Sequence, residues 1–321
     1  MRVQTSDEPM LSIRNLVKSY PGRLKPAVEG LTLDVAGGEI RGLVGLNGAG
    51  KTTVLRACAG LITPSAGLVK VCGFDVSTEK LKASRHLGLV QEFPNFNPGG
   101  KALAQLVYFA GYFGYRGRDA TNHCSSLLMR VGLEGSANLR IGSFSQGMKK
   151  RFALAAALLG DPKVLLLDEV LNGLDPQGVV MVRNLMSDLR DEGKAILLSS
   201  HNLSLVEQVA DNVTILHKGR LVTTLAKKDL QEGHSGDLRI TLKQVDQAAL
   251  DFLGGFGSVR RKGDVVWVSG IKSKPDEINA ALVTRGYRVR DLSFVSSSLE
   301  ELFFDLIDVE NDGTKEAEED L

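Results

Sequence analysis

One glycine-rich stretch, GLNGAGKTT from Gly45 to Thr53, constrains the fold of this chain more than any other segment. It fits the pattern G-x-x-x-x-G-K-[ST], in which backbone N–H groups surround a phosphate. Residues 40–44 before it are mostly apolar and predict a strand, and residues 54–60 after it predict a helix that ends at a glycine. A strand, a glycine loop and a helix in this order direct N–H groups and a positive helix end towards phosphate oxygens. The stretch therefore predicts a nucleoside triphosphate site, against the alternative of a glycine-rich turn before an ordinary helix.

The residue types within this loop have separate tasks. The glycines let the backbone wrap a phosphate without a clashing Cβ. We expect Lys51 to reach the β- and γ-phosphates and Thr52 to offer its hydroxyl to Mg²⁺. The residues expected to line the nucleotide are Gly45, Leu46, Asn47, Gly48, Ala49, Gly50, Lys51, Thr52 and Thr53.

Length and composition limit the number of domains, the kinds of partner and the compartment expected for this chain. The 321 residues suffice for one large domain plus a smaller one, or for two of ordinary size. A formal net charge of +1 argues against a surface that coats nucleic acid. Three cysteines predict reduced thiols, and the polar N-terminus shows no secretory signal. The most membrane-like run, 103–115, is shorter than the roughly 20 residues that span a bilayer. We expect a cytosolic fold with any membrane link supplied by a partner.

The sequence pattern predicts a parallel sheet covered by helices, followed by a smaller unit. Residues 164–167 and 195–199 are apolar throughout, as in strands buried on both faces, and a helix is predicted over 177–192 between them. From about 102 to 159 the pattern is helical. Strands and helices from 238 to 307 predict a small α+β unit, and the acidic residues 308–321 predict a disordered tail.

Two carboxylates follow the apolar run 164–167. At the end of a buried strand beside a phosphate loop, Asp168 is positioned to hold Mg²⁺ together with Thr52. Glu169, one residue later, is positioned to act as general base towards the attacking water. The alternative is a strand that simply ends in a solvated acidic turn.

Three further residues are candidates that carry little weight alone. Gln91 follows a short strand and has an amide that can contact Mg²⁺ or the lytic water, although most such residues are surface polar groups. Tyr20 has a ring that can stack on adenine, and a rim or core aromatic is the alternative. His201 follows the strand at 195–200 and can reach the γ-phosphate or hold the water-activating carboxylate, or it is an ordinary histidine at a strand end.

A second phosphate-binding pattern occurs at Ser145, Gln146 and Gly147, which open a predicted helix over 148–159. Ser145 is a good N-cap, which alone would explain it. A hydroxyl, a glycine and a positive helix end also form a phosphate-binding surface separate from the first. A second phosphate-binding surface is hard to explain in a chain with one phosphate loop, unless it binds the nucleotide of another subunit.

The order of these motifs resembles the ATP-binding subunit of ABC transporters, over about residues 11–225. They match, in order, that family's adenine-stacking aromatic, Walker A, Q-loop, signature, Walker B, D-loop and switch histidine: Tyr20, Gly45 to Thr53, Gln91, Ser145-Gln146-Gly147, Asp168-Glu169, Gly173-Leu174-Asp175 and His201.

The resemblance implies an α/β fold of the P-loop NTPase class, with a RecA-like, mostly parallel sheet, an antiparallel β subdomain and an α-helical subdomain. It implies an ATP-binding domain over 11–229 with its helical subdomain at about 92–159, and a small C-terminal α+β accessory domain over 230–307. The tail would be 308–321.

The resemblance also implies a mechanism with ATP and Mg²⁺. Two subunits sandwich two nucleotides, each between one Walker A loop and the opposing signature. Glu169 would be the catalytic base, His201 the switch residue and Gln91 the link to Mg²⁺ and to a membrane subunit, while Asp175 would lie across the dimer seam.

Three departures from the family pattern are visible. Gln146 and Met148 stand where many signatures have Gly and Gln, a variant that resembles the drug-, lipid- and polysaccharide-export branch with a separate ATPase chain. Leu46 replaces a common proline, and Val170-Leu171 replace the usual Pro-Thr after Glu169. None of these removes a catalytic group.

The leading interpretation is thus an ATPase subunit on the cytoplasmic face of the cell membrane that powers an exporter. Its expected partners are a transmembrane permease subunit and a second copy of itself, or a paired ATPase subunit. One alternative is an ABC ATPase acting on ribosomes or DNA, disfavoured by the single Walker A and the lack of heptads, and nucleic acid is not an expected partner. An importer ATPase is the other alternative.

Overall fold

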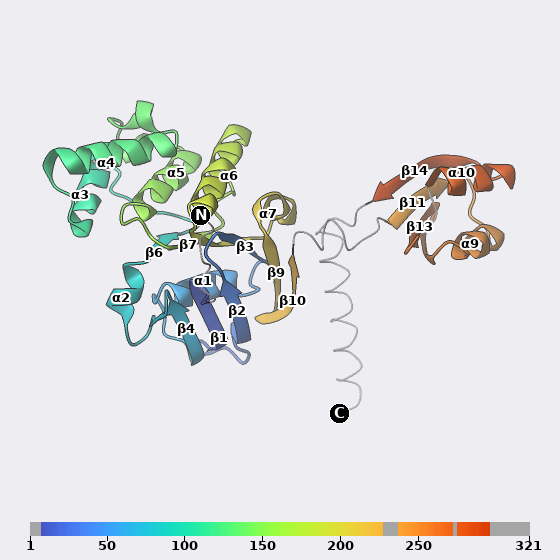
Figure 1. Ribbon diagram of the computed structural model, residues 1–321, viewed down its shortest axis with the longest axis horizontal. Coiled ribbons are helices and arrows are strands. Elements are labelled where there is room, and N and C mark those ends of the chain that lie inside the picture. Colours follow the sequence, from blue (N-terminus) through green and yellow to red (C-terminus); the bar gives the residue numbers. More distant parts are fainter. Residues whose placement is uncertain (1–7, 227–236, 272–274, 296–321) are drawn as a thin grey trace, which may run out of the picture. The chain divides into compact units, whose positions relative to one another are not determined.

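The computed structural model describes residues 8–226, 237–271 and 275–295. The chain divides into two compact units, Met1–Thr224 and Leu225–Leu321 (Figure 1). The first unit contains two sheets and a group of helices, and the second contains one sheet with helices. The assignment of 11–229 and 230–307 as the functional domains stays a prediction. The end of the predicted α+β unit, residues 296–307, and the predicted tail 308–321 lie outside the described residues.

The central sheet of the first unit has the strand order β10-β9-β3-β8-β7-β6. The pairs β9–β3, β3–β8, β8–β7 and β7–β6 are parallel, as the apolar runs predict. Because the strands are parallel, their carboxyl ends meet at one edge, where ligands bind in open α/β sheets. The strands are β3 (Glu39–Val44), β6 (Leu87–Val90), β7 (Val164–Asp168), β8 (Ala195–Ser200), β9 (Asn212–His217) and β10 (Arg220–Ala226).

A second, antiparallel sheet packs over helix α1 (Lys51–Cys58), which also contacts β7 and β8. Buried side chains of α1, such as Val54 and Leu55, share one core with Leu43 of the central sheet and Leu11 of the antiparallel sheet. The strand order is β2-β1-β4-β5, with β1 (Leu11–Lys18), β2 (Val28–Val35), β4 (Ala66–Val71) and β5 (Phe74–Asp75). The first helical turn after the glycine loop is thus fixed between two sheets.

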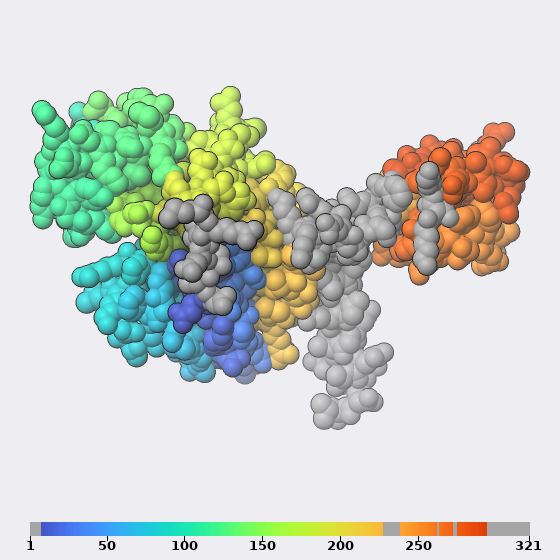
Figure 2. All heavy atoms as spheres, in the orientation of Figure 1, coloured from blue at the N-terminus to red at the C-terminus, as the bar shows by residue number. Residues whose placement is uncertain are grey.

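The helical group lies between β6 and β7 in the sequence, as predicted. In Figure 2 this group, in green, and the antiparallel sheet, in blue, occupy opposite ends of the visible face of the first unit. Phe152 of α5 is fully buried, and its ring meets that of Phe96 edge-on at 4.8 Å. The helices are α3 (Ala102–Ala110), η1 (Gly111–Phe113), α4 (Gly117–Arg130), η2 (Glu134–Ser136), η3 (Ile141–Ser143) and α5 (Gln146–Ala157).

Two further helices flank the central sheet. The long helix α6 (Pro176–Asp191) joins β7 to β8 and lies where the sequence predicts one. Two short helices were not predicted from the sequence, α2 (Lys80–Ser84) and α7 (Leu203–Val209). Both span so few turns that an amphipathic period is hard to recognise. Within the described residues, no helix combines the length and apolarity needed to cross a membrane.

The second unit has the element order β-α-β-β-α-β and the sheet order β12-β13-β11-β14, with every pair antiparallel. This is the split βαβ arrangement of ferredoxin-like folds. Leu238, Val266 and Leu282 belong to its separate buried core. The elements are β11 (Asp237–Leu242), α9 (Gln247–Gly254), β12 (Ser258–Lys262), β13 (Val265–Ser269), α10 (Pro275–Thr284) and β14 (Val289–Val295).

Candidate active site

The glycine loop leaves β3 at Gly45 and enters α1 at Lys51. Gly50 has φ of +108°, and a Cβ there would lie 2.5 Å from the carbonyl oxygen of Ala27. A side chain at this position is therefore excluded both by backbone conformation and by space. The sequence keeps Gly50 because the loop must turn sharply to bring its N–H groups to the start of α1.

The loop lines a polar cleft of about 300 Å³. Lys51 and Glu169 face each other across it, with Nζ 3.5 Å from Oε1, and both side chains are 6% exposed. The cleft also contains Arg23 and Glu92, which the sequence analysis did not single out. Its lining residues are Arg23, Ala27, Asn47, Gly48, Ala49, Gly50, Lys51, Thr52, Thr53, Glu92 and Glu169.

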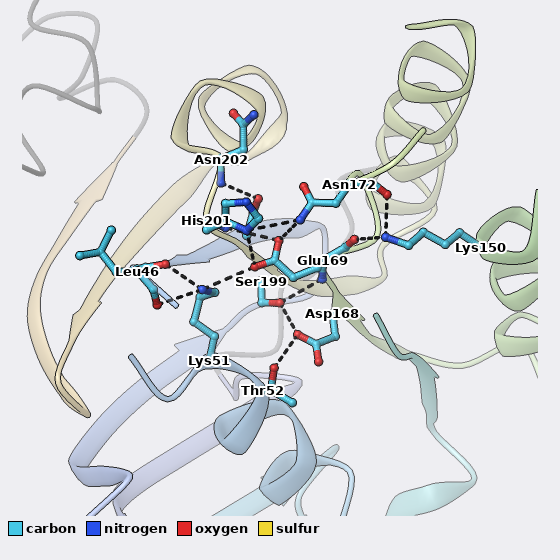
Figure 3. A network of polar contacts seen from close by, with 12 residues as sticks. Leu46, Lys51, Thr52, Lys150, Asp168, Glu169, Asn172, Ser199, His201 and Asn202 are labelled. Atoms are coloured by element: carbon cyan, nitrogen blue, oxygen red, sulfur yellow. Dashed lines mark hydrogen bonds and ion pairs between the residues drawn. The ribbon is translucent and has the colours of Figure 1, made fainter. Parts of the chain in front are cut away.

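Backbone oxygens hold the Lys51 side chain within the loop. Nζ donates to the carbonyl oxygen of Gly45 at 2.7 Å and to that of Leu46 at 3.3 Å (Figure 3). The side chain of Leu46 itself is 46% exposed. Replacement of the common proline by Leu46 therefore leaves the lysine ammonium within the loop.

Asp168 lies at the end of β7, beside Ser199 of β8 (Figure 3). Its Oδ1 accepts hydrogen bonds from the hydroxyl of Thr52 at 3.2 Å and from that of Ser199 at 2.6 Å. Asp168 is 5% exposed. A buried carboxylate and a threonine hydroxyl are oxygen ligands of the type that Mg²⁺ prefers, so Thr52 and Asp168 fit this ion.

Glu169 carries the second carboxylate, whose oxygens are contacted by His201 and Asn172. Its Oε1 lies 3.1 Å from Nδ1 of His201, and its Oε2 accepts a hydrogen bond from the amide of Asn172 at 2.7 Å (Figure 3). Glu169 adopts φ of +48°, a conformation uncommon for a residue other than glycine. The side chain of Glu169 is buried, whereas that of His201 is 48% exposed. The structure thus brings the two predicted residues, Glu169 and His201, into direct contact.

Three residues of this network were not predicted from the sequence: Lys150, Asn172 and Ser199. Ser199 accepts a hydrogen bond from the backbone N–H of Glu169 at 3.1 Å while it donates to Asp168. It therefore joins both carboxylate positions. The signal in the sequence was weak, because a serine in a buried strand is also an ordinary core residue.

Gln91 and Tyr20 lie at the margin of the site. Val90 pairs with Leu167, so Gln91 follows at the same sheet edge as Asp168. The side chain of Gln91 is exposed, and its neighbour Glu92 lines the cleft. Tyr20 has the Lys18 ammonium 5.2 Å from its ring centroid and neighbours Arg23, which lines the cleft. Their roles in binding Mg²⁺ and adenine stay predictions.

The second predicted phosphate surface does not line this cleft. Ser145 is the N-cap of α5 and accepts from the N–H of Met148 at 3.2 Å, and both Ser145 and Gln146 are exposed. Gly147 follows in the first turn. Asp175 similarly caps α6 and accepts from the N–H of Gly178 at 3.1 Å. Capping is therefore observed at both positions, and their roles towards a nucleotide stay predictions.

A larger groove has a volume of about 510 Å³. Arg130 of α4 and several residues of α6, among them Val180 and Met181, line it. It contains none of the phosphate-loop residues and neither Asp168 nor Glu169. The charged side chains of Lys51 and Glu169 converge instead in the smaller polar cleft.

The sequence matches the family described as ABC transporter over residues 28–172. It is 37% identical over 247 residues to the Nod factor export ATP-binding protein I of Burkholderia orbicola (strain AU 1054), which covers 77% of this chain and 81% of the relative. It is 32% identical over 303 residues to the bacitracin transport ATP-binding protein BcrA of Bacillus licheniformis, covering 93% of this chain and 97% of the relative. The chain belongs to the ABC transporter ATP-binding subunits.

Solved structures support the same family. The ATP-binding subunit of an ABC transporter aligns with a TM-score of 0.63 and 28% identity, covering 70% of this chain and 92% of that one. The cbiO1 protein from Clostridium perfringens aligns with a TM-score of 0.62 and 27% identity, covering 70% and 91%. The P-loop NTPase fold and ATP hydrolysis expected from the sequence are confirmed for this ABC ATPase, and its resemblance to the export branch agrees with the names of its relatives.

Proposed function

We propose that this ABC ATPase hydrolyses ATP to drive export through a separate membrane subunit. The observation that carries the proposal is the buried Glu169 carboxylate, which lies opposite Lys51 across the cleft and is oriented by His201 and Asn172. A carboxylate held at both oxygens is ready to accept a proton in a defined direction.

Residues in and beside the cleft have separate tasks in this reaction. The loop amides and Lys51 bind the phosphates of ATP. Thr52 and Asp168 would hold Mg²⁺, which supplies charge neutralisation at the phosphate oxygens. Glu169 accepts a proton from the attacking water, and His201 keeps the carboxylate in position through its contact with Oε1. Gln91, at the same sheet edge, connects the site to the membrane subunit.

A second copy of the chain completes the site. Ser145 and Gly147 do not line the cleft of their own chain, yet they begin a helix whose N–H groups suit a phosphate. In a two-fold dimer the same surface on each copy reaches the nucleotide of the other, which gives two equal sites. Tyr20 stacks on the adenine ring, and Asp175 lies at the seam. ATP binding closes this dimer and hydrolysis reopens it.

The proposed export direction rests on the relative named Nod factor export ATP-binding protein I. The match to the bacitracin transport protein covers 93% of this chain and therefore extends into the second unit. We infer a partner with transmembrane helices and a location on the cytoplasmic face of the membrane. Co-purification with a polytopic membrane protein supports this inference, whereas co-purification with ribosomes or DNA contradicts it. A partner system that contains a substrate-binding protein would indicate import.

Substitution Glu169→Gln tests the reaction itself, because it keeps the shape of the side chain and removes the base. We expect turnover to fall by about 10²- to 10⁴-fold with ATP binding retained. The matched control is Glu79→Gln, whose carboxylate pairs with Lys82 on the surface. Hydrolysis near the wild-type rate in Glu169→Gln, with ATP binding unchanged, would show that Glu169 is not the base.

A further inference from the structure

Lys150 carries a buried charge that the roles above do not use. It lies in α5 and is 5% exposed. Burial lowers the pKa of its ammonium, against the opposing effect of the carboxylates of Glu92, Glu169 and Asp168. A buried ammonium is costly unless it is hydrogen-bonded, so its bonding partners indicate why the position holds a lysine.

Both partners of Lys150 are backbone oxygens of one turn (Figure 3). Nζ donates to the carbonyl oxygen of Glu169 at 2.6 Å and to that of Asn172 at 2.7 Å. The N–H of Asn172 donates to the carbonyl oxygen of Glu169 at 3.2 Å. The two carbonyls are thus the first and last of a tight turn, and the ammonium joins them from the side of α5.

This turn determines where the catalytic carboxylate lies. Glu169 opens it with φ of +48°, a conformation that persists only where the surroundings hold it. Asn172 closes the turn and donates its side-chain amide to Glu169 Oε2. Lys150 therefore holds both the residue that carries the base and the residue that orients it.

The same lysine connects the turn to the helix that begins with the signature. Ser145 caps α5, and Lys150 lies one turn further along it. In the first turn of α5, a Cβ on Gly147 would lie 3.3 Å from Cδ2 of Leu174, so the helix packs closely on the loop that continues from Asn172. With contacts at two points, a displacement of α5 displaces the loop that carries Glu169.

We propose that Lys150 is a positioning residue that sets the Glu169 carboxylate by joining α5 to the Glu169–Asn172 turn. The inference rests on the proposed role of Glu169 as the base. It makes the placement of the base depend on the placement of Ser145, which begins the same helix and serves the other nucleotide site.

Lys150→Met removes the ammonium and keeps the aliphatic stem. We expect kcat to fall about 10- to 100-fold, because a displacement near 1 Å costs a reaction up to about 100-fold. The KM for ATP and the affinity for ATP should change by less than about threefold, since the phosphate loop is untouched. Lys150→Arg should restore most of kcat, because a guanidinium can donate to both carbonyls.

The matched control is Lys194→Met. Lys194 is also 5% exposed, and its Nζ donates to the carbonyl oxygen of Pro162 at 3.0 Å and pairs with Asp161. It precedes β8, at the end of the sheet opposite the site. Lys194→Met should lower the melting temperature and leave kcat unchanged, which separates loss of a buried charge from loss of catalytic positioning.

A double mutant decides whether Lys150 acts through Glu169. In a Glu169→Gln background, Lys150→Met should cause no further loss of the residual turnover, because the group it positions is already inactive. A kcat of Lys150→Met near the wild-type value, or a full additional loss in the double mutant, overturns the inference. If Lys150→Met does not fold, Lys150→Gln is judged by the same two criteria. A weak effect of Glu169→Gln alone would instead contradict the proposed function.

Discussion

The side-chain amide of Asn172 donates to Oε2 of Glu169 over 2.7 Å, and the two residues are the ends of the same turn. His201 approaches the other carboxylate oxygen from the loop after β8, at 3.1 Å. The Glu169 carboxylate is therefore held by the loop that carries it and by a neighbouring strand end. The proposed catalytic role of Glu169 depends on a small group of polar contacts, several of which can be removed one at a time.

Asn172→Ala should lower kcat about tenfold with little change in the KM for ATP, because Oε2 of the carboxylate loses the hydrogen bond from the Asn172 amide. Asn172→Asp should be worse, since a second carboxylate would repel Glu169. Asn184→Ala, an exposed asparagine in α6, is the matched control. Steady-state ATPase kinetics measure all three, and a wild-type kcat in Asn172→Ala would contradict an orienting role.

Ser199→Ala should raise the Mg²⁺ concentration needed for half-maximal activity, because Asp168 loses the hydroxyl that orients its Oδ1. It should also cost about 1–3 kcal/mol of stability, the usual effect of removing a buried hydrogen-bond partner. Ser200→Ala is the control: Ser200 is equally buried, but its Oγ accepts from the N–H of Asn202. Mg²⁺ titrations that are identical for the two variants would rule out this role of Ser199.

Site residues that belong to a short sequence motif could be predicted. Site residues that reach the site only through the pairing of distant strands could not. The glycine loop and the acidic end of the apolar run 164–167 each depend on neighbouring residues, so the sequence indicated Lys51, Asp168 and Glu169 together. Ser199 joins the same site only because β7 and β8 pair with Asp168 opposite Ser199. Asp168 and Ser199 are 31 positions apart in the sequence, and a shift of one residue in the pairing would turn Ser199 to the other face of the sheet.

In the second unit, likewise, the separate elements could be predicted from the sequence but their arrangement could not. The strands and helices within 238–295 were predicted nearly in place, because each has its own apolar pattern. Their sheet order, β12-β13-β11-β14, was not predicted, since it depends on pairing between segments such as Asp237–Leu242 and Val289–Val295 that are far apart in the sequence. Lys150 escaped notice for a related reason: a lysine in a helix is usually exposed, and only the fold buries it.

The cysteines predict a pH dependence of stability. Burial raises the pKa of the Cys58 thiol from 9.0 to about 12 and that of Cys124 to about 11. Above pH 9 the unfolded chain releases thiol protons that the folded chain keeps. The contribution of the two buried thiols to the free energy of unfolding is therefore full below pH 9 and is lost as the pH rises towards 12. Urea unfolding at pH 8 and pH 10 should show this loss, reduced in Cys58→Ala. Rapid reaction of Cys58 with a thiol reagent at pH 8, in the folded protein, would contradict its burial.

The most direct test of the shared site mixes two inactive variants, Lys51→Ala and Ser145→Arg. Each alone should lack ATPase activity, and Ser145→Arg should still bind ATP at its own phosphate loop. In a mixed dimer, one site combines the intact loop of the Ser145→Arg chain with the intact helix start of the Lys51→Ala chain. An equal mixture should therefore recover about a quarter of the wild-type activity. A mixture with the double variant Lys51→Ala/Ser145→Arg in place of Ser145→Arg has no intact site and should stay inactive. An equal mixture that forms mixed dimers, shown by capture through different tags, yet hydrolyses no ATP would contradict the account.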